Sequence, residues 1–406
     1  MPLIVVGTLV ALSACTGTPH QSTAVPEVRI GLLGALSGPG TGQEASRGAE
    51  LAALVVNQVQ SLPLPLSGAA GLPGLGGAKI RIVQPDPGAN PNDPAAQATG
   101  LVARQHVVGL ISADSAKATA VASERTERIG VPFLGSVASA DFLTERGLDW
   151  FFRATPTDQL VAEAALALVE KNSGGAANKI GIVNASDDTS NDSATSVQRV
   201  AGEAGDTLAP LAPAVFESGQ GPRREVDQVH GANPRPDAVI AVASQPGDAR
   251  ALIATGALST TGPQSLAIGA GFSPQTVGQA GLGAGAAVLH GAVWTQDFAE
   301  RNLAASAVAS LYQRRFKAPM TEAAAETFTA VLTLAQAVDS ARSLDAQAIR
   351  TALLGLNVPG RDTIMPWGGI RFDQTGQNVQ AAALVERITP NAARVVFPQE
   401  LAGDNT

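Results

Sequence analysis

The chain has 406 residues, of which 45% are hydrophobic and 15% are charged, and its formal net charge is −8. That apolar content is enough to build a folded core, which excludes an intrinsically disordered chain. The acidic balance argues against nucleic acid or an anionic membrane surface as a binding partner. About 380 residues follow the N-terminal segment. One hydrophobic core usually holds fewer, so we expect two domains.

Residues 1–14 form an apolar leader that is followed directly by Cys15 in a Leu-Ser-Ala-Cys tetrad. The leader is shorter than the roughly 20 residues of a membrane-spanning helix, which favours a secretory signal peptide. The tetrad resembles the lipobox of bacterial lipoproteins, which implies that Cys15 is lipidated and that residues 15–26 form a lipidated tether. Cys15 is the only cysteine, which excludes an internal disulfide. No Lys or Arg precedes the leader, so we expect the true start to lie upstream of Met1.

The first half of the remaining chain alternates short apolar runs with longer helical stretches. The predicted strands are 28–33, 79–84, 107–111 and 131–134, and the predicted helices are 44–59, 92–105 and 116–128. Strands separated by helices of about 10 to 15 residues indicate βαβ crossovers and therefore a parallel sheet. Residues 62–77 are rich in Pro, Gly and Leu without periodicity, and we expect them to form a surface loop.

The same alternation restarts after Arg153 and predicts a second doubly wound unit. Its predicted strands are 179–183, a strand near 214, 237–241 and 265–268, and its predicted helices are 158–171, 192–204 and 248–257. Helices at 299–316, 321–341 and 345–354 follow, and then strands at 369–372 and 380–388. The sequence therefore predicts an α/β protein of two Rossmann-like units.

The main catalytic and cofactor signatures are missing from the sequence. There is no phosphate-binding Gly-x-x-x-x-Gly-Lys loop and no Gly-x-Ser-x-Gly elbow, and the run Gly269-Ala270-Gly271 lacks the third glycine of a dinucleotide fingerprint. The four histidines have no ligand-like neighbour nearby in the sequence. We therefore predict no catalytic residue, no cofactor and no metal site. A hydrolase with a triad assembled from distant residues stays open as an alternative.

Small hydroxyl residues and glycines follow three of the predicted strands, in the loops 36–42, 112–117 and 135–139. Ligands of parallel α/β sheets bind at the carboxyl ends of the strands, where backbone N–H groups of helix N-termini suit a carboxylate or another small anion. A serine before a helix is usually only an N-cap, so each loop alone is a weak signal. Three such loops at successive strand ends favour a binding site.

Several short motifs occur in an order and spacing typical of one family. They are RIG at 29–31, LSGP at 36–39, RGAELA at 47–52, SAKATA at 115–120, FRATP at 152–156 and GIRFDQTGQN at 369–378. With them the chain resembles the type I periplasmic binding proteins, and it is most similar to the leucine/isoleucine/valine-binding branch that serves ABC importers. The resemblance implies two Rossmann-like lobes joined by three hinge crossings, with the ligand trapped by closure of the lobes.

The resemblance also implies a division of the chain and a carboxylate site. Lobe 1 comprises residues 27–155 plus 297–358, and lobe 2 comprises residues 156–296 plus 359–406. The family pattern places Ser115, Ala138 and Ser139 around the carboxylate of the ligand, through hydroxyl and backbone groups.

The remaining ligand-binding residues carried over from the family lie in loops where the sequence departs from the usual pattern. They are Ser37 and Thr41 in the first loop, Asp188 and Ser190 in the first loop of lobe 2, and Gly271 and Phe272. Thr41 and Ser190 stand where aromatic residues are expected, and Gly271 stands where an acid grips the ligand ammonium. An ammonium buried without a partner is costly, so Asp187 or Asp188 is an open substitute.

The resemblance implies an extracytoplasmic solute-binding lipoprotein of an ABC importer and not an enzyme. It would be anchored to the membrane through Cys15 and would capture a small carboxylate- or amide-bearing solute, similar to a branched-chain amino acid. The expected partners are this small-molecule ligand and the permease subunits, and we expect a monomer. The alternative is a regulatory lipoprotein that senses a ligand with the same fold.

Overall fold

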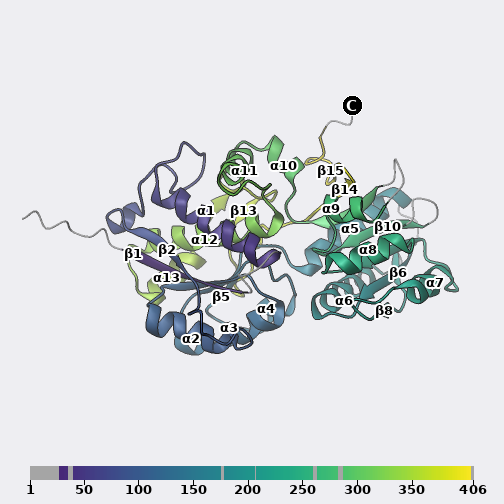
Figure 1. Cartoon of the computed structure of the whole chain (residues 1–406), viewed down its shortest axis with the longest axis horizontal. Helices are drawn as coiled ribbons and strands as arrows, with labels where there is room; N and C mark the ends of the chain where they lie inside the picture. Colours follow the sequence, from purple (N-terminus) through teal and green to yellow (C-terminus); the bar gives the residue numbers. More distant parts are fainter. Residues whose placement is uncertain are drawn as a thin grey trace, which may run out of the picture.

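The computed structural model describes residues 27–34, 40–174, 178–205, 207–258, 263–281 and 287–403. Within these residues the strands form two large sheets, each covered by helices, which lie side by side as two lobes in Figure 1. The first lobe, at the left of Figure 1, is built mainly from the N-terminal part of the chain, but the late helices α11, α12 and α13 also belong to it.

The first lobe contains a five-stranded parallel sheet with the order β2-β1-β3-β4-β5. Its strands are β1 (Glu27–Leu33), β2 (Lys79–Val83), β3 (Gly109–Ser112), β4 (Phe133–Gly135) and β5 (Phe151–Arg153). Its helices are α1 (Thr41–Asn57), α2 (Pro94–Gln105), α3 (Ala116–Ile129), α4 (Phe142–Glu145), α11 (Leu303–Phe316), α12 (Glu322–Ala341) and α13 (Ala346–Leu354). The strand order reverses between β1 and β3, so the loops after these two strands meet at a topological switch point.

The second lobe contains an eight-stranded mixed sheet with the order β15-β14-β11-β10-β9-β6-β7, in which β8 also pairs with β6. Its strands are β6 (Asn178–Ala185), β7 (Leu208–Pro210), β8 (Ala214–Phe216), β9 (Ala238–Val242), β10 (Gln264–Ile268), β11 (Val288–Ala292), β14 (Leu384–Thr389) and β15 (Ala392–Phe397). Its helices are α5 (Asp158–Ser173), α6 (Asp188–Glu203), α7 (Arg223–His230), α8 (Pro246–Ala254), α9 (Pro274–Gln279) and α10 (Gln296–Arg301). Here the order reverses between β6 and β9, while β14 and β15 pair in the antiparallel direction.

The central strands are apolar because helices cover both faces of each sheet. All five residues of β9 are buried, and so are all four residues of β3. Helix α12 is buried along most of its length and packs on α1. This close packing depends on Gly48, where a Cβ would lie 2.2 Å from the Ala324 carbonyl oxygen.

The chain passes between the lobes three times, and the crossings are tied to one another. The first crossing follows β5, the second follows β11, and the third leads into β14 from the small hairpin of β12 (Val358–Pro359) and β13 (Gly369–Ile370). The Asn378 side chain donates to the Ala154 carbonyl over 2.9 Å, which joins the third crossing to the first. The Trp294 indole N–H donates to the Ile364 carbonyl over 3.0 Å, which joins the second crossing to the segment before the third.

The predicted insert at 62–77 is not only a surface loop. Leu64 and Leu72 are buried, and the short helix η1 (Pro73–Leu75) lies against α12. The Gly74 N–H donates to the Asp339 side chain over 2.7 Å. A run without helical or strand periodicity is therefore fixed here by tertiary packing.

Candidate functional site

Ser115 lies at the carboxyl end of β3 and is the N-cap of α3. Its hydroxyl oxygen accepts from the Ala118 N–H over 3.3 Å, and the Ser115 side chain is exposed. No described residue accepts a hydrogen bond from the Ser115 hydroxyl. The hydroxyl proton and the first N–H groups of α3 are therefore available to an anion.

Ala138 and Ser139 lie in the loop that follows β4. The backbone N–H groups of both residues donate to no described residue. The loop is held from behind by Arg153, a fully buried side chain at the end of β5, which donates to the carbonyl groups of Ala138 and Ala140 over 3.4 Å and 2.7 Å. Burial lowers the pKa of Arg153 to about 10, although the charge of Asp158 acts in the opposite direction. Arg153 thus positions two free backbone donors at the edge of the sheet.

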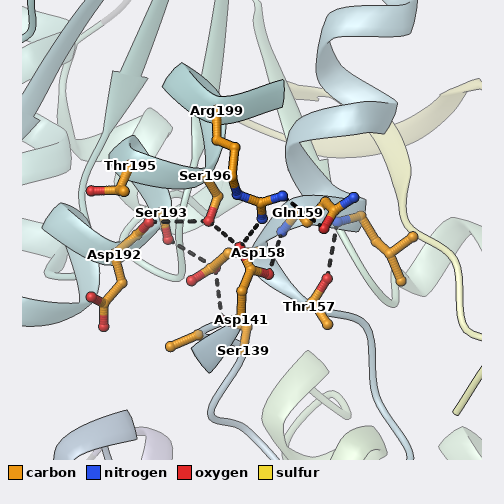
Figure 2. A network of polar contacts seen from close by, with 12 residues as sticks. Ser139, Asp141, Thr157, Asp158, Gln159, Asp192, Ser193, Thr195, Ser196 and Arg199 are labelled. Atoms are coloured by element: carbon orange, nitrogen blue, oxygen red, sulfur yellow. Dashed lines mark hydrogen bonds and ion pairs between the residues drawn. The ribbon is translucent and has the colours of Figure 1, made fainter. Parts of the chain in front are cut away.

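The Ser139 hydroxyl is engaged with Asp158, the first residue of α5 (Figure 2). The hydroxyl groups of Ser139 and Ser193 each donate to the Asp158 Oδ1 atom over 2.9 Å. The Oδ2 atom is sealed from solvent and has no hydrogen-bond partner. Burial raises the pKa of Asp158 to about 6, although the two hydroxyl groups lower it. The residue predicted to bind a carboxylate therefore also binds a carboxyl group of the protein.

Asp141 joins the same first-lobe loop to α5 and α6 of the second lobe, as Figure 2 shows. It accepts from the Gln159 N–H over 2.9 Å, from the Ser196 hydroxyl over 2.6 Å and from the Arg199 guanidinium over 2.6 Å. The hydrogen bond and charge of Asp141 raise the pKa of Arg199 and outweigh its partial burial. The lobes are thus connected by an ion pair beside the first crossing.

In the loop between β6 and α6 of the second lobe, most polar side chains form hydrogen bonds within the protein. Asp187 is the N-cap of α6 and accepts from the Ser190 N–H, the Ser190 hydroxyl and the Ser244 hydroxyl over 3.0, 2.7 and 2.7 Å. The buried Ser190 hydroxyl oxygen also accepts from the Ser244 N–H over 2.9 Å. Asp188 is exposed and has no hydrogen-bond partner among the described residues. Of the two carboxylates considered as substitutes for the missing acid, Asp188 is the unpaired one.

Gly271 and Phe272 follow β10 in the second lobe. The Gly271 N–H donates to the Ala243 carbonyl over 3.1 Å, and a Cβ at Gly271 would lie 2.6 Å from the Gln245 carbonyl oxygen. Phe272 is buried, with its ring centroid 5.9 Å from that of His290. The close backbone contacts exclude a side chain at position 271 with this loop conformation.

Of the remaining predicted positions, Thr41, Ser37 and Cys15, only Thr41 lies among the described residues. Thr41 is exposed and begins α1. Ser37 and Cys15 lie outside the described residues, as do the predicted signal peptide and tether.

A buried acidic cluster near the second crossing was not predicted. It comprises Glu322 and Glu326 of α12, His290 of β11 and Glu386 of β14. The His290 Nδ1 and Glu386 Oε1 atoms are 3.2 Å apart, and this contact outweighs burial and raises the pKa of His290. Burial raises the pKa of Glu322, and burial together with the Glu322 charge raises the pKa of Glu326 well above its ordinary value.

The described part of the chain holds no group of three or more His, Cys, Asp or Glu side chains placed to bind a metal ion. It also contains no helix that is both long and apolar enough to cross a bilayer.

Two α/β lobes, three tied crossings and polar loops at the carboxyl ends of the strands define a two-lobed solute-binding protein fold. A family model described as periplasmic binding protein matches residues 27–391. The chain belongs to this family, in its type I, leucine/isoleucine/valine-binding-like branch. The resemblance and the fold class predicted from the sequence are thereby confirmed.

Individual relatives are distant. The chain is 30% identical over 165 residues to Leu/Ile/Val-binding protein homolog 7 of Brucella abortus (strain 2308), a stretch that covers 40% of this chain and 38% of that protein. It shares its fold with LivJ from Streptococcus pneumoniae in complex with isoleucine, at 19% identity and a TM-score of 0.68, over 92% of this chain and 100% of that chain. A solute binding protein from R. palustris in complex with 4-hydroxybenzoate is 16% identical, with a TM-score of 0.65, over 93% of this chain and 94% of that chain.

Proposed function

We propose that the protein is the extracytoplasmic substrate-binding component of an ABC importer, and that it captures a small carboxylate- or amide-bearing solute between its lobes. The observation that carries this proposal is the set of free donors at one sheet edge. The hydroxyl of Ser115 and the backbone N–H groups of Ala138 and Ser139 have no acceptor among the described residues. Donors of this kind beside a helix N-terminus suit a carboxylate or an amide oxygen.

The proposed solute resembles a branched-chain amino acid and is trapped by closure of the lobes about the three crossings. The other predicted contacts, from Ser37, Thr41, Asp188, Ser190 and the loop at 271–272, belong to this proposal. We further propose that the chain acts as a monomer without catalysis and delivers its solute to permease subunits. Lipidation of Cys15 would hold it at the cell membrane, because two acyl chains give stable anchoring.

The proposal is tested by a thermal-shift screen of the chain from Thr16 onward against amino acids, short amides and small organic acids. A solute at 100 times its Kd stabilises the folded state by about 2.7 kcal/mol, which raises the melting temperature measurably. We expect Ser115→Ala to weaken binding of the active solute by about tenfold, the effect of one lost hydrogen bond, while Ser306→Ala on α11 leaves it unchanged. Absence of stabilisation by every carboxylate and amide would contradict the proposal.

A further inference from the structure

Of the three positions from which an acid would be expected to reach a ligand ammonium, 271, Asp187 and Asp188, the first two are not available. A side chain at Gly271 would collide with the carbonyl oxygens of Gln245 and Ala243, at 2.6 Å and 2.7 Å from its Cβ. The Asp187 carboxylate is already bound by the hydroxyl groups of Ser190 and Ser244. Asp188 is unpaired but exposed, and an exposed carboxylate attracts an ammonium only weakly. A cationic solute that binds tightly therefore needs a buried acid from another element.

Glu326 lies on α12 between the carboxyl ends of strands from both sheets. The next residue, Thr327, has its hydroxyl oxygen 3.1 Å from that of Ser136, the residue that follows β4. One turn earlier, Glu322 accepts from the N–H groups of Val293 and Trp294, which follow β11, over 2.8 Å and 3.1 Å. Ligands of α/β proteins bind at the carboxyl ends of parallel strands, so the first turns of α12 lie where a ligand is expected.

Glu326 is also a buried acid without a partner. The residue is only 8% exposed, and no described residue donates a hydrogen bond to it. Its carboxyl oxygens are not among the unpartnered atoms that are sealed from solvent, so they reach accessible space. Buried carboxyl groups are normally paired, and Glu322 one turn away has its two backbone donors. The carboxyl group of Glu326 is therefore available to form a hydrogen bond or ion pair with a bound molecule.

We propose that Glu326 binds the positively charged group of the solute, an ammonium, and so replaces the acid that cannot stand at position 271. This inference rests on the proposed function, because it assumes that the solute lies between the lobes. With the free donors at 138–139 it makes the site complementary to a molecule that carries both a carboxylate and an ammonium. Discrimination follows from burial, because a solute without the ammonium leaves the carboxyl group unpaired.

The proposal has a protonation consequence. Burial and the neighbouring Glu322 both raise the pKa of Glu326, and His290 of β11 and Glu386 of β14 lie around Glu322. Glu326 therefore keeps its proton to higher pH than an exposed glutamate does. An ammonium that binds to the ionised carboxylate displaces this proton, so binding of a cationic solute releases a proton to the buffer.

The test is calorimetry of the full mature chain with L-leucine and with 2-hydroxy-4-methylpentanoate, which replaces the ammonium by a hydroxyl. We expect Glu326→Gln to weaken leucine binding by about 30-fold or more, to leave binding of the hydroxy acid nearly unchanged, and to abolish proton release measured in buffers of different ionisation enthalpy. Retained binding of the hydroxy acid shows that the variant is folded. Asp188→Asn is the competing variant, and we expect it to weaken leucine binding less than Glu326→Gln does. The matched control is Glu50→Gln at an exposed position of α1, which we expect to bind leucine as the unmodified protein does.

Three results would overturn the inference. Unchanged leucine binding by Glu326→Gln, or a loss of leucine binding in Asp188→Asn alone, would show that Glu326 does not bind the ammonium. Tight binding of the hydroxy acid by the unmodified protein without binding of leucine would overturn the role of Glu326 and leave the proposed function standing. If no carboxylate or amide binds at all, the proposed function fails, and the inference fails with it.

Discussion

The pH dependence of stability should carry a measurable contribution from Asp158. This carboxyl group is 5% exposed, has one oxygen without a partner, and has a pKa of about 6 in the folded protein against an ordinary value of 3.8. Burial is the main cause, and the charge of Arg153 and the hydroxyl groups of Ser139 and Ser193 only partly offset it. The folded state therefore favours the protonated form of Asp158.

The sign of the effect follows from proton linkage. Between pH 3.8 and about 6 the folded chain retains a proton that the unfolded chain has lost, so stability falls as pH rises through this window. The full loss is about 3 kcal/mol, since each pKa unit corresponds to about 1.36 kcal/mol. Below this window Asp158 contributes no penalty, and above it the penalty is constant. From about pH 5 to about pH 7.5 the same relation gives a loss of about 1.4 kcal/mol.

Urea unfolding of the unmodified protein and of Asp158→Asn at these two pH values isolates this contribution. We expect the unmodified protein to lose about 1.4 kcal/mol relative to the variant as the pH rises. Ser193→Ala removes a hydroxyl group that lowers the pKa of Asp158, so it should extend the loss to higher pH. A stability difference between the unmodified protein and Asp158→Asn that is the same at both pH values would refute this reasoning.

Three further substitutions test individual contacts by urea unfolding. Gly271→Ala should cost about 1–3 kcal/mol, because its Cβ would lie 2.6 Å from the Gln245 carbonyl oxygen; an unchanged midpoint would contradict this crowding. Arg153→Met should lower the free energy of unfolding by about 3–5 kcal/mol, because it leaves the buried Thr144 hydroxyl, the Gln377 side chain and the Ala140 carbonyl without their donor; an unchanged value would show that these hydrogen bonds are dispensable. Arg199→Ala breaks the partly exposed ion pair with Asp141 and should lower the free energy of unfolding by about 1 kcal/mol or less, an effect that decreases as salt is added. A larger loss that does not depend on salt would show that the ion pair is shielded from solvent.

Most of the long elements could be predicted because local patterns determine them. The buried strand β9 is a continuous apolar run, β1 has buried apolar residues from Ile30 to its end, and α12 has a helical pattern over its whole length. The short elements β5, β7, β11, β12, β15, α4, α7 and α9 were missed. Strand β11 reads VLHGA, and its His and Gly interrupt the apolar run, so only its pairing with β10 and β14 identifies it as a strand.

The predicted starts of helices were less accurate where the polar capping residues resembled a loop in the sequence. Helix α6 begins at Asp188, four residues before the predicted start at 192, because Asp187 caps it through the Ser190 N–H. The predicted helix at 299–316 is in fact two helices, α10 and α11, and Asn302 between them caps the second through the Ala305 N–H. Side-chain caps thus moved the boundaries and did not change the type of element.

The candidate site could be predicted only in part, since its decisive contacts join distant parts of the chain. The exposed hydroxyl of Ser115 follows from its position between a strand and a helix. The partners of Ser139 could not be foreseen, because Asp158 reaches it only when α5 of the second lobe lies against the first-lobe loop. Glu326 gave no signal at all, because in the run AAAETF it reads as an ordinary residue of a helix interior.

Selectivity for the solute is expected from the polar groups of the site that have no hydrogen-bond partner within the protein. Ser139 and Ser190 give their hydroxyl groups to Asp158 and Asp187, so these four side chains already stabilise the fold. A ligand that used these hydroxyl groups and carboxylates would have to replace hydrogen bonds that they already make with one another, and it would gain little. The backbone donors at 138–139 and the carboxyl group of Glu326 have no such contacts to lose. A solute with both a carboxylate and an ammonium gains the full interaction with these donors and with Glu326. A solute that lacks one of the two charged groups leaves a buried polar group of the protein unpaired. The site should therefore select solutes by the presence of both charged groups rather than by size.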